Sequence, residues 1–213
     1  MSANTILQSI LTISLVVVGL WIAFWVYKAN KNSRANTYLS IVIVLSILFI
    51  FSDYLAFFTE PALTTLLERI AYGLAPIAVC VLYLFSLDFP EKSKNNIFIT
   101  VPIVIYSIFF AISSIFSNLI IVSTKINTWG VDSTGGMLEV YYGIFSILAV
   151  MAILYMTLRR YGISSKADKL KIRFFLFGLT IFILSEAVFV LILPIFQLDR
   201  FSYFGDYSIL IFF

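Results

Sequence analysis

Apolar residues occur in long, nearly continuous runs along the chain, and short polar segments separate these runs. A helix of about 20 apolar residues crosses the lipid hydrocarbon, which is about 30 Å thick, at 1.5 Å per residue. Six runs reach this length. They predict six membrane-spanning helices at approximately 6–27, 38–58, 63–87, 97–116, 138–158 and 172–195.

A seventh apolar run opens after Asp206 and ends with the sequence at Phe213. At helical rise, residues 207–213 cover only about 10 Å and stop inside the bilayer. A terminal carboxylate there would cost several kcal/mol, so we expect the natural protein to continue past Phe213. The connections between the runs are short. The predicted fold is therefore all-α, a polytopic transmembrane helix bundle of six complete spans plus the start of a seventh, forming a single membrane domain over 1–213 with no soluble domain.

Composition supports a membrane protein and narrows its chemistry. Hydrophobic residues make up 62% and charged residues 12% of the chain, against about 45–50% and about 25% in soluble domains. The chain has no histidine, which excludes a histidine general base and a histidine metal ligand. Its single cysteine excludes an intramolecular disulfide. No nucleophile or metal-ligand spacing is present, so we expect no catalytic residues, no metal and no cofactor. A net charge of +3 is too small to indicate nucleic acid as a partner.

The distribution of basic residues predicts the orientation of the chain. Eleven of the 14 lysines and arginines lie in the connections after the first, third and fifth spans, and only Lys125 and Arg200 lie on the other side. Because cytoplasmic loops are enriched in basic residues, we expect these connections in the cytoplasm of a cell-membrane protein with its N-terminus outside. The longest connection, 117–137, contains Gly130, Gly135 and Gly136, which favour a short hairpin or a cap at the outer surface.

Ionisable residues inside predicted spans are the main candidates for function, because each costs about 2.5–3.5 kcal/mol near the membrane centre. Asp53, Arg69 and Glu186 fall in this class, and all three are predicted in the outer half of the bilayer. Tyr72 shares a helical surface with both Glu68 and Arg69. The sequence therefore predicts a polar, outward-facing, ligand-binding pocket lined by Asp53, Glu68, Arg69, Tyr72, Glu139, Tyr142 and Glu186.

Two interpretations of Arg69 remain open from the sequence. In the first, its guanidinium group pairs with an anionic group of an unknown small ligand. In the second, it forms an internal ion pair with Glu186 or Asp53 that fixes helix packing. The basic stretch 159–173 likewise either binds anionic membrane lipids or only holds its loop in the cytoplasm.

Several segments, taken in order, resemble a known family, the seven-helix N-terminal sensor module of bacterial and archaeal histidine kinases and related diguanylate cyclases. The third span opens with a charged pair, contains a proline and closes with an aromatic and proline motif. The sixth has a basic entry and an internal glycine. These segments are LERIAY at 67–72, Pro76, LFSLDFP at 84–90, KLKIRFFLFG at 169–178, LP at 193–194 and FG at 204–205.

The resemblance implies a non-catalytic sensory input domain. Such a domain detects an extracytoplasmic or membrane-borne stimulus and passes a conformational signal through the seventh helix to a cytoplasmic output module, a histidine kinase or cyclase, which this chain does not contain. It also implies a homodimer. The alternative is a small multi-pass transporter, which Pro76 and Pro194 permit by allowing broken helices. The transporter interpretation lacks a detectable internal repeat.

Overall fold

Six long helices and one β-hairpin make up the computed structural model. It describes residues 3–90, 97–127, 130–193 and 196. The helices are α1 (Ala3–Ala29), α2 (Arg34–Ala56), α3 (Pro61–Asp88), α4 (Ile97–Phe116), α5 (Glu139–Ile163) and α6 (Lys166–Glu186), which continues into a π-helical turn, η1 (Ala187–Ile192). The strands are β1 (Ile121–Ile126) and β2 (Val131–Gly135).

The predicted all-α membrane bundle is confirmed. All six helices are long and apolar enough to cross a membrane, and the chain is a multi-pass membrane protein. The start of the seventh span, residues 207–213, lies outside the described residues. The expected hairpin in the longest connection is also confirmed, because β1 and β2 pair antiparallel with an irregularity between Ile121 and Ser123.

Polar side chains determine where two helices begin, and the hydrophobic pattern placed both starts too late. The hydroxyl of Ser33 accepts a hydrogen bond from the Asn36 N–H, so α2 begins at Arg34. Ser165 likewise accepts from the Asp168 N–H, so α6 begins at Lys166. Side-chain acceptors of this kind satisfy the exposed N–H groups of a first helical turn. Both helices therefore extend as polar turns beyond their apolar runs.

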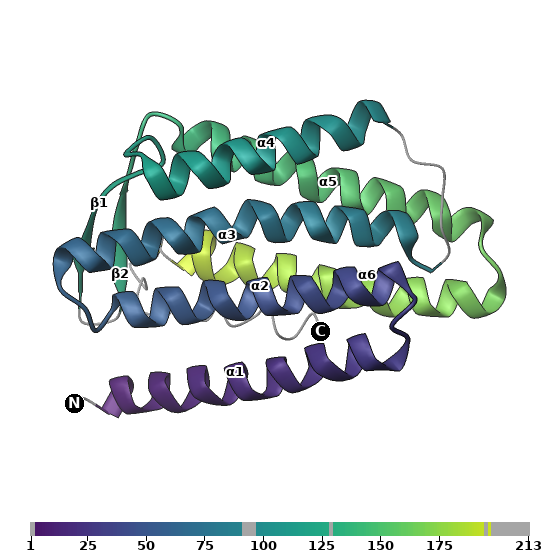
Figure 1. The fold of residues 1–213 in the computed structure, drawn as a ribbon, viewed down its shortest axis with the longest axis horizontal. Helices are drawn as coiled ribbons and strands as arrows, with labels where there is room; N and C mark the ends of the chain where they lie inside the picture. Colours follow the sequence, from purple (N-terminus) through teal and green to yellow (C-terminus); the bar gives the residue numbers. More distant parts are fainter. Residues whose placement is uncertain (1–2, 91–96, 128–129, 194–195, 197–213) are drawn as a thin grey trace.

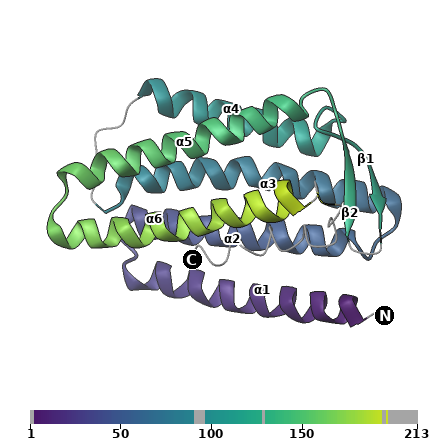
Figure 2. The same ribbon diagram turned by 180° about the vertical axis from the view of Figure 1, so that it is seen from behind.

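Helix α3 lies at the centre of the bundle. It packs against α2, α4, α5 and β1, whereas α1 packs on α2 and α6 on α5. The helices run roughly parallel to one another, and α1 lies at the edge, on the side of α2 away from α4 (Figure 1). Both views place the hairpin and the start of α1 at the same end of the bundle (Figure 2). We call this the hairpin end, and the other the basic end.

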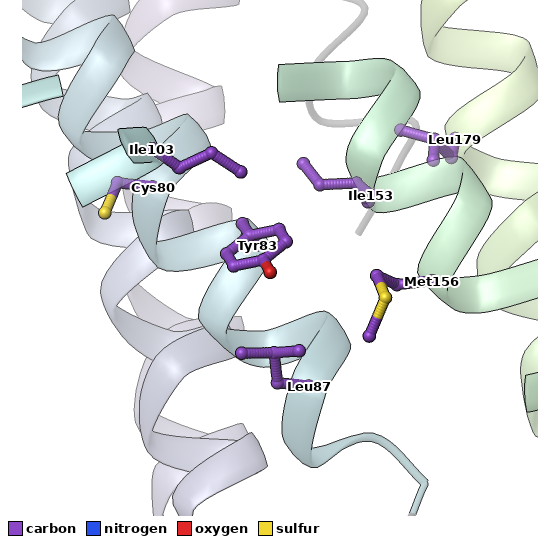
Figure 3. Packing of buried hydrophobic residues seen from close by; sticks show 7 residues of the cluster. All are labelled: Cys80, Tyr83, Leu87, Ile103, Ile153, Met156 and Leu179. Atoms are coloured by element: carbon purple, nitrogen blue, oxygen red, sulfur yellow. The ribbon is translucent and has the colours of Figure 1, made fainter. Parts of the chain in front are cut away.

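The main apolar core joins four helices in the half of the bundle toward the basic end. Tyr83 and Leu87 of α3 point toward Ile153 and Met156 of α5 (Figure 3). Tyr83 is fully buried, and its hydroxyl lies 3.1 Å from the hydroxyl of Thr100 in α4. The remaining members of this core are Cys80, Ile103 and Leu179. Side chains of α3, α4, α5 and α6 thus meet in one cluster.

A second apolar cluster packs the hairpin against the helices of the bundle. Ile120 and Ile121 are almost fully buried and pack with Phe110 of α4 and Phe145 of α5. At the same end of the hairpin, where β2 leads into α5, Gly136 lies directly against main chain, because an added Cβ would come within 2.4 Å of the Leu119 carbonyl oxygen. Only a residue without a side chain fits this approach. The start of β1 and the segment after β2 therefore lie together where the hairpin joins the bundle.

Candidate functional site

Polar side chains from α2, α3, α5 and the hairpin gather at the hairpin end. Most of the residues singled out in the sequence lie here. Helix α2 ends at this point and α3 begins, so that Asp53 and Glu68 are brought together although they are fifteen positions apart. Helix α5 begins directly after β2 and carries Glu139 and Tyr142 into the same region.

The carboxyl groups of Asp53 and Glu68 interact with each other across the α2–α3 contact. Glu68 is buried, with 4% of its surface exposed. Its Oε2 atom accepts a hydrogen bond of 3.3 Å from the hydroxyl of Ser133 in β2. Glu68 therefore connects α2, α3 and the hairpin at one point.

Arg69 binds the hairpin. Its Nε and Nη2 atoms donate to the Ile121 carbonyl at 3.1 and 2.9 Å. Nη2 also donates to the Val122 carbonyl at 3.2 Å and to Asn118 Oδ1 at 2.6 Å. The predicted alternative pairing with Asp53 is not formed, because the described part of the chain has no ion pair at Arg69. The guanidinium group is committed to the start of β1, so holding the hairpin is the role that its contacts support.

Tyr72 and Tyr142 come together as neighbouring rings, with their centroids 5.9 Å apart. The hydroxyl of Tyr142 donates to the main-chain carbonyl of Tyr72 at 3.0 Å. Phe110 of α4 packs edge-on against the Tyr142 ring at 5.7 Å. These contacts tie α5 to α3 just below the charged side chains.

The two remaining candidates do not join the acid pair. Glu139 is exposed, and its carboxylate covers Gly135, where an added Cβ would lie 1.6 Å from Oε2. Glu186 ends α6, and its side chain lies outside the described residues. The structure thus brings together Asp53 with Glu68 and Tyr72 with Tyr142, and it separates Arg69 and Glu139 from these pairs.

Sequence reasoning missed the polar partners that the hairpin supplies. Ser133 and Asn118 bind Glu68 and Arg69, and Thr124 of β1 lies 2.8 Å from the hydroxyl of Thr65 in α3. Small polar residues in a surface loop carry no distinctive signal. The pairing of Thr124 opposite Ser133 in the hairpin register places both side chains beside the first turns of α3.

A second buried charge, which belongs to the basic stretch 159–173, occupies the basic end. Arg160 of α5 is 6% exposed and donates to the carbonyls of Leu87 and Phe89 at the end of α3. Asp88 lies close enough to interact with its charge. A cation at the C-terminus of a helix satisfies terminal carbonyls and interacts favourably with the helix dipole. Helix α3 is therefore held by charged side chains at both of its ends.

Comparisons with known proteins do not assign this chain to a family. Comparison of the chain with protein-family models, with curated proteins and with solved structures finds no match. Within the described ranges, no three acidic, cysteine or histidine side chains are grouped to hold a metal ion. The arrangement can bind or release a proton at the acid pair, and it can transmit a movement of the hairpin to α3.

Proposed function

We propose that this chain is a sensory input domain embedded in the cell membrane. It detects an extracytoplasmic or membrane-borne stimulus at the hairpin end and passes a conformational signal to a cytoplasmic output module of the histidine-kinase kind. The family resemblance described above motivates this proposal. The observation that carries it is the pair of charged contacts at the two ends of α3.

Helix α3 can couple the two ends of the bundle. Its 28 residues extend about 42 Å. Glu68 and Arg69 connect its first turns to the hairpin, and its last carbonyls accept hydrogen bonds from Arg160 of α5. Helix α5 leads directly into α6, and the resemblance implies that a seventh helix, following α6, carries the signal to the output module. A stimulus that favours one of two arrangements of the hairpin end would shift the population of arrangements at the basic end.

The proposed orientation has the hairpin end outside and the basic end in the cytoplasm. Arg159, Lys166, Lys169, Lys171 and Arg173 are all near the α5–α6 turn, and the positive-inside rule places that turn in the cytoplasm. The cationic groups of Lys169 and Arg173 lie over the Tyr161 ring there, 5.6 and 5.5 Å from its centroid. We propose anionic membrane lipids as partners of this turn, and a homodimer as the signalling unit.

Distance measurements at the basic end test the sensor proposal. The full chain, with Cys80→Ser and spin labels at Lys31→Cys and Lys166→Cys, is placed in phosphatidylcholine vesicles. Probes are a change in pH, sodium phosphate, sodium acetate and added phosphatidylglycerol. We expect at least one probe to change the distance between the labels, and Arg69→Gln, which loosens the hairpin, to reduce that change.

Two outcomes would overturn the proposal. One is a constant distance between the labels under every probe. The other is accumulation of radiolabelled phosphate or acetate inside vesicles against its gradient, which would favour the transporter alternative. Arg69→Gln has a matched control in Lys125→Gln, an exposed cation on the same hairpin, which we expect to leave the distance change intact.

A further inference from the structure

We propose that the carboxyl groups of Asp53 and Glu68 form a proton-binding site, which holds one proton between α2 and α3 and thereby keeps the hairpin end closed. The signalling role of this site rests on the proposed function and names its stimulus as the proton. The binding of the proton itself is an independent claim about these two side chains.

The hydrogen bonds of Glu68 are incomplete without a proton. Oε2 accepts from Ser133, but Oε1 is buried and receives no hydrogen bond from any donor in the described chain. The neighbouring group is the carboxyl of Asp53. Two carboxylates only accept hydrogen bonds, so their contact becomes a hydrogen bond when one of them carries a proton. A single proton therefore satisfies the buried oxygen and removes the repulsion between two adjacent negative charges.

Other charged groups near this end are turned to different partners. The Arg69 guanidinium group, on the next residue of α3, faces the carbonyls of β1. Asp132, beside Ser133 in β2, is bonded to Asn127. The carboxylate of Glu139 in α5 lies over Gly135. Among the other charged side chains that the structure describes at this end, Glu60 and Lys125 are exposed.

Several polar groups of the packed helices near this end also bond to other partners. Ser114 of α4 donates to the Arg69 carbonyl at 2.9 Å, and Tyr142 of α5 donates to the Tyr72 carbonyl. Tyr54 of α2 donates to Ser9 of α1 at 2.8 Å. No cation among the described side chains is placed to neutralise the acid pair. Two carboxyl groups and one hydroxyl are also fewer ligands than Ca²⁺ takes from proteins.

Loss of the proton would open the hairpin end. Two carboxylates in contact, one of them buried, repel each other, and the α2–α3 contact is where they can separate. Because Ser133 binds Glu68, a movement of this side chain also loosens β2. Protonation closes the hairpin end and deprotonation opens it. Helix α3 transmits this conformational change to its contact with Arg160.

Infrared spectroscopy tests the proton directly. The full chain in phosphatidylcholine vesicles, in potassium buffer at neutral pH, is expected to show the carbonyl stretch of a protonated carboxylic acid, which carboxylates lack. We expect Glu68→Gln and Asp53→Asn each to lose this band. The matched control is Glu60→Gln, an exposed acid at the start of the same helix, and it should retain the band. Deuterium exchange identifies the band by its isotope shift.

The wild-type spectrum alone can overturn the inference, whether or not the variants fold. Absence of the band at neutral pH, or its persistence in both variants, contradicts a proton at this pair. A carboxylate shift on adding sodium or calcium, with no protonated band before the addition, assigns the pair to a metal cation. If the band behaves as expected while the basic-end distance stays constant across pH, the proton site stands and its sensory role fails.

Discussion

The hydroxyl group of Tyr142 donates a 3.0 Å hydrogen bond to the main-chain carbonyl of Tyr72. This carbonyl would otherwise be approached by the main-chain N–H four residues later in α3, but that residue is Pro76, which has none. A side chain from α5 thus supplies the donor that the proline removes from α3. The proline is tolerated here in a spanning helix because a neighbouring helix provides the hydrogen bond.

Replacing Tyr142 by phenylalanine is expected to weaken the contact between α3 and α5. The variant keeps the ring and its packing on Phe110 but loses the hydrogen bond, at a cost of about 1 kcal/mol. Unfolding of the detergent-solubilised protein by added dodecyl sulfate measures this difference. Tyr141→Phe is the control, since Tyr141 is exposed. Equal stabilities of the two variants would contradict the assigned role of the Tyr142 hydroxyl.

Gly73 permits the close approach of α3 and α4. A Cβ at this position would lie 2.7 Å from Cγ1 of Ile115 and 3.3 Å from the Ala111 carbonyl oxygen. Gly73→Ala should therefore reduce the free energy of unfolding by about 1–3 kcal/mol, as overpacking does. At Gly143 of α5 an added Cβ meets nothing within 4 Å, so Gly143→Ala should be neutral or stabilising. The same dodecyl sulfate titration measures the free energy of unfolding of both variants. An unchanged value for Gly73→Ala would show that α4 can shift to accommodate the added methyl group.

Two adjacent arginines at the end of α5 are expected to behave differently. Arg160 is buried on the terminal carbonyls of α3, whereas Arg159 is exposed. Arg160→Ala should cost about 1.5–3 kcal/mol, because it removes charged hydrogen bonds to buried carbonyls. Arg159→Ala should change the stability by less than about 0.5 kcal/mol. Thermal unfolding in detergent compares them, and similar losses would mean that only their positive charge matters.

The proposed orientation predicts which positions react from outside the cell. In a Cys80→Ser background, Lys125→Cys on the hairpin should react with a membrane-impermeant maleimide in intact cells. Lys166→Cys at the start of α6 should react only after the membrane is permeabilised. Both residues are exposed, so a difference reports the side of the membrane. The reverse pattern would place the hairpin in the cytoplasm.

The hydrophobic pattern predicted the helices well because crossing a bilayer requires long apolar runs. The predicted span 97–116 coincides with α4, Ile97–Phe116. The errors lie at polar ends, where α2 and α6 begin with capped turns at Ser33 and Ser165. Hydropathy cannot detect such turns, because they extend beyond the hydrocarbon.

The sequence singled out the residues of the candidate site but did not predict which groups they contact. Asp53 stood out because acids are rare in apolar helices, and Glu68 because it shares a helical surface with Tyr72. Their contact, however, depends on how α2 and α3 are aligned. Among the described side chains, Arg69 forms no ion pair with Asp53, and its guanidinium group binds main-chain carbonyls of the hairpin. Every residue has a main-chain carbonyl, so the sequence does not indicate which carbonyls Arg69 binds. The Tyr142 bond could have been anticipated from Pro76 only with knowledge of which helix lies opposite.

The position of α1 at the edge of the bundle has a consequence for the response to membrane composition. Its contacts with α2 include Ser40 with the Ala23 carbonyl and Asn36 with the Val26 carbonyl, and the side chains of Val17 and Trp21 are exposed. A change in bilayer thickness alters the preferred tilt of a lipid-facing helix. Such a change would act first on α1 and reach α3 through α2, at the helix that carries Asp53.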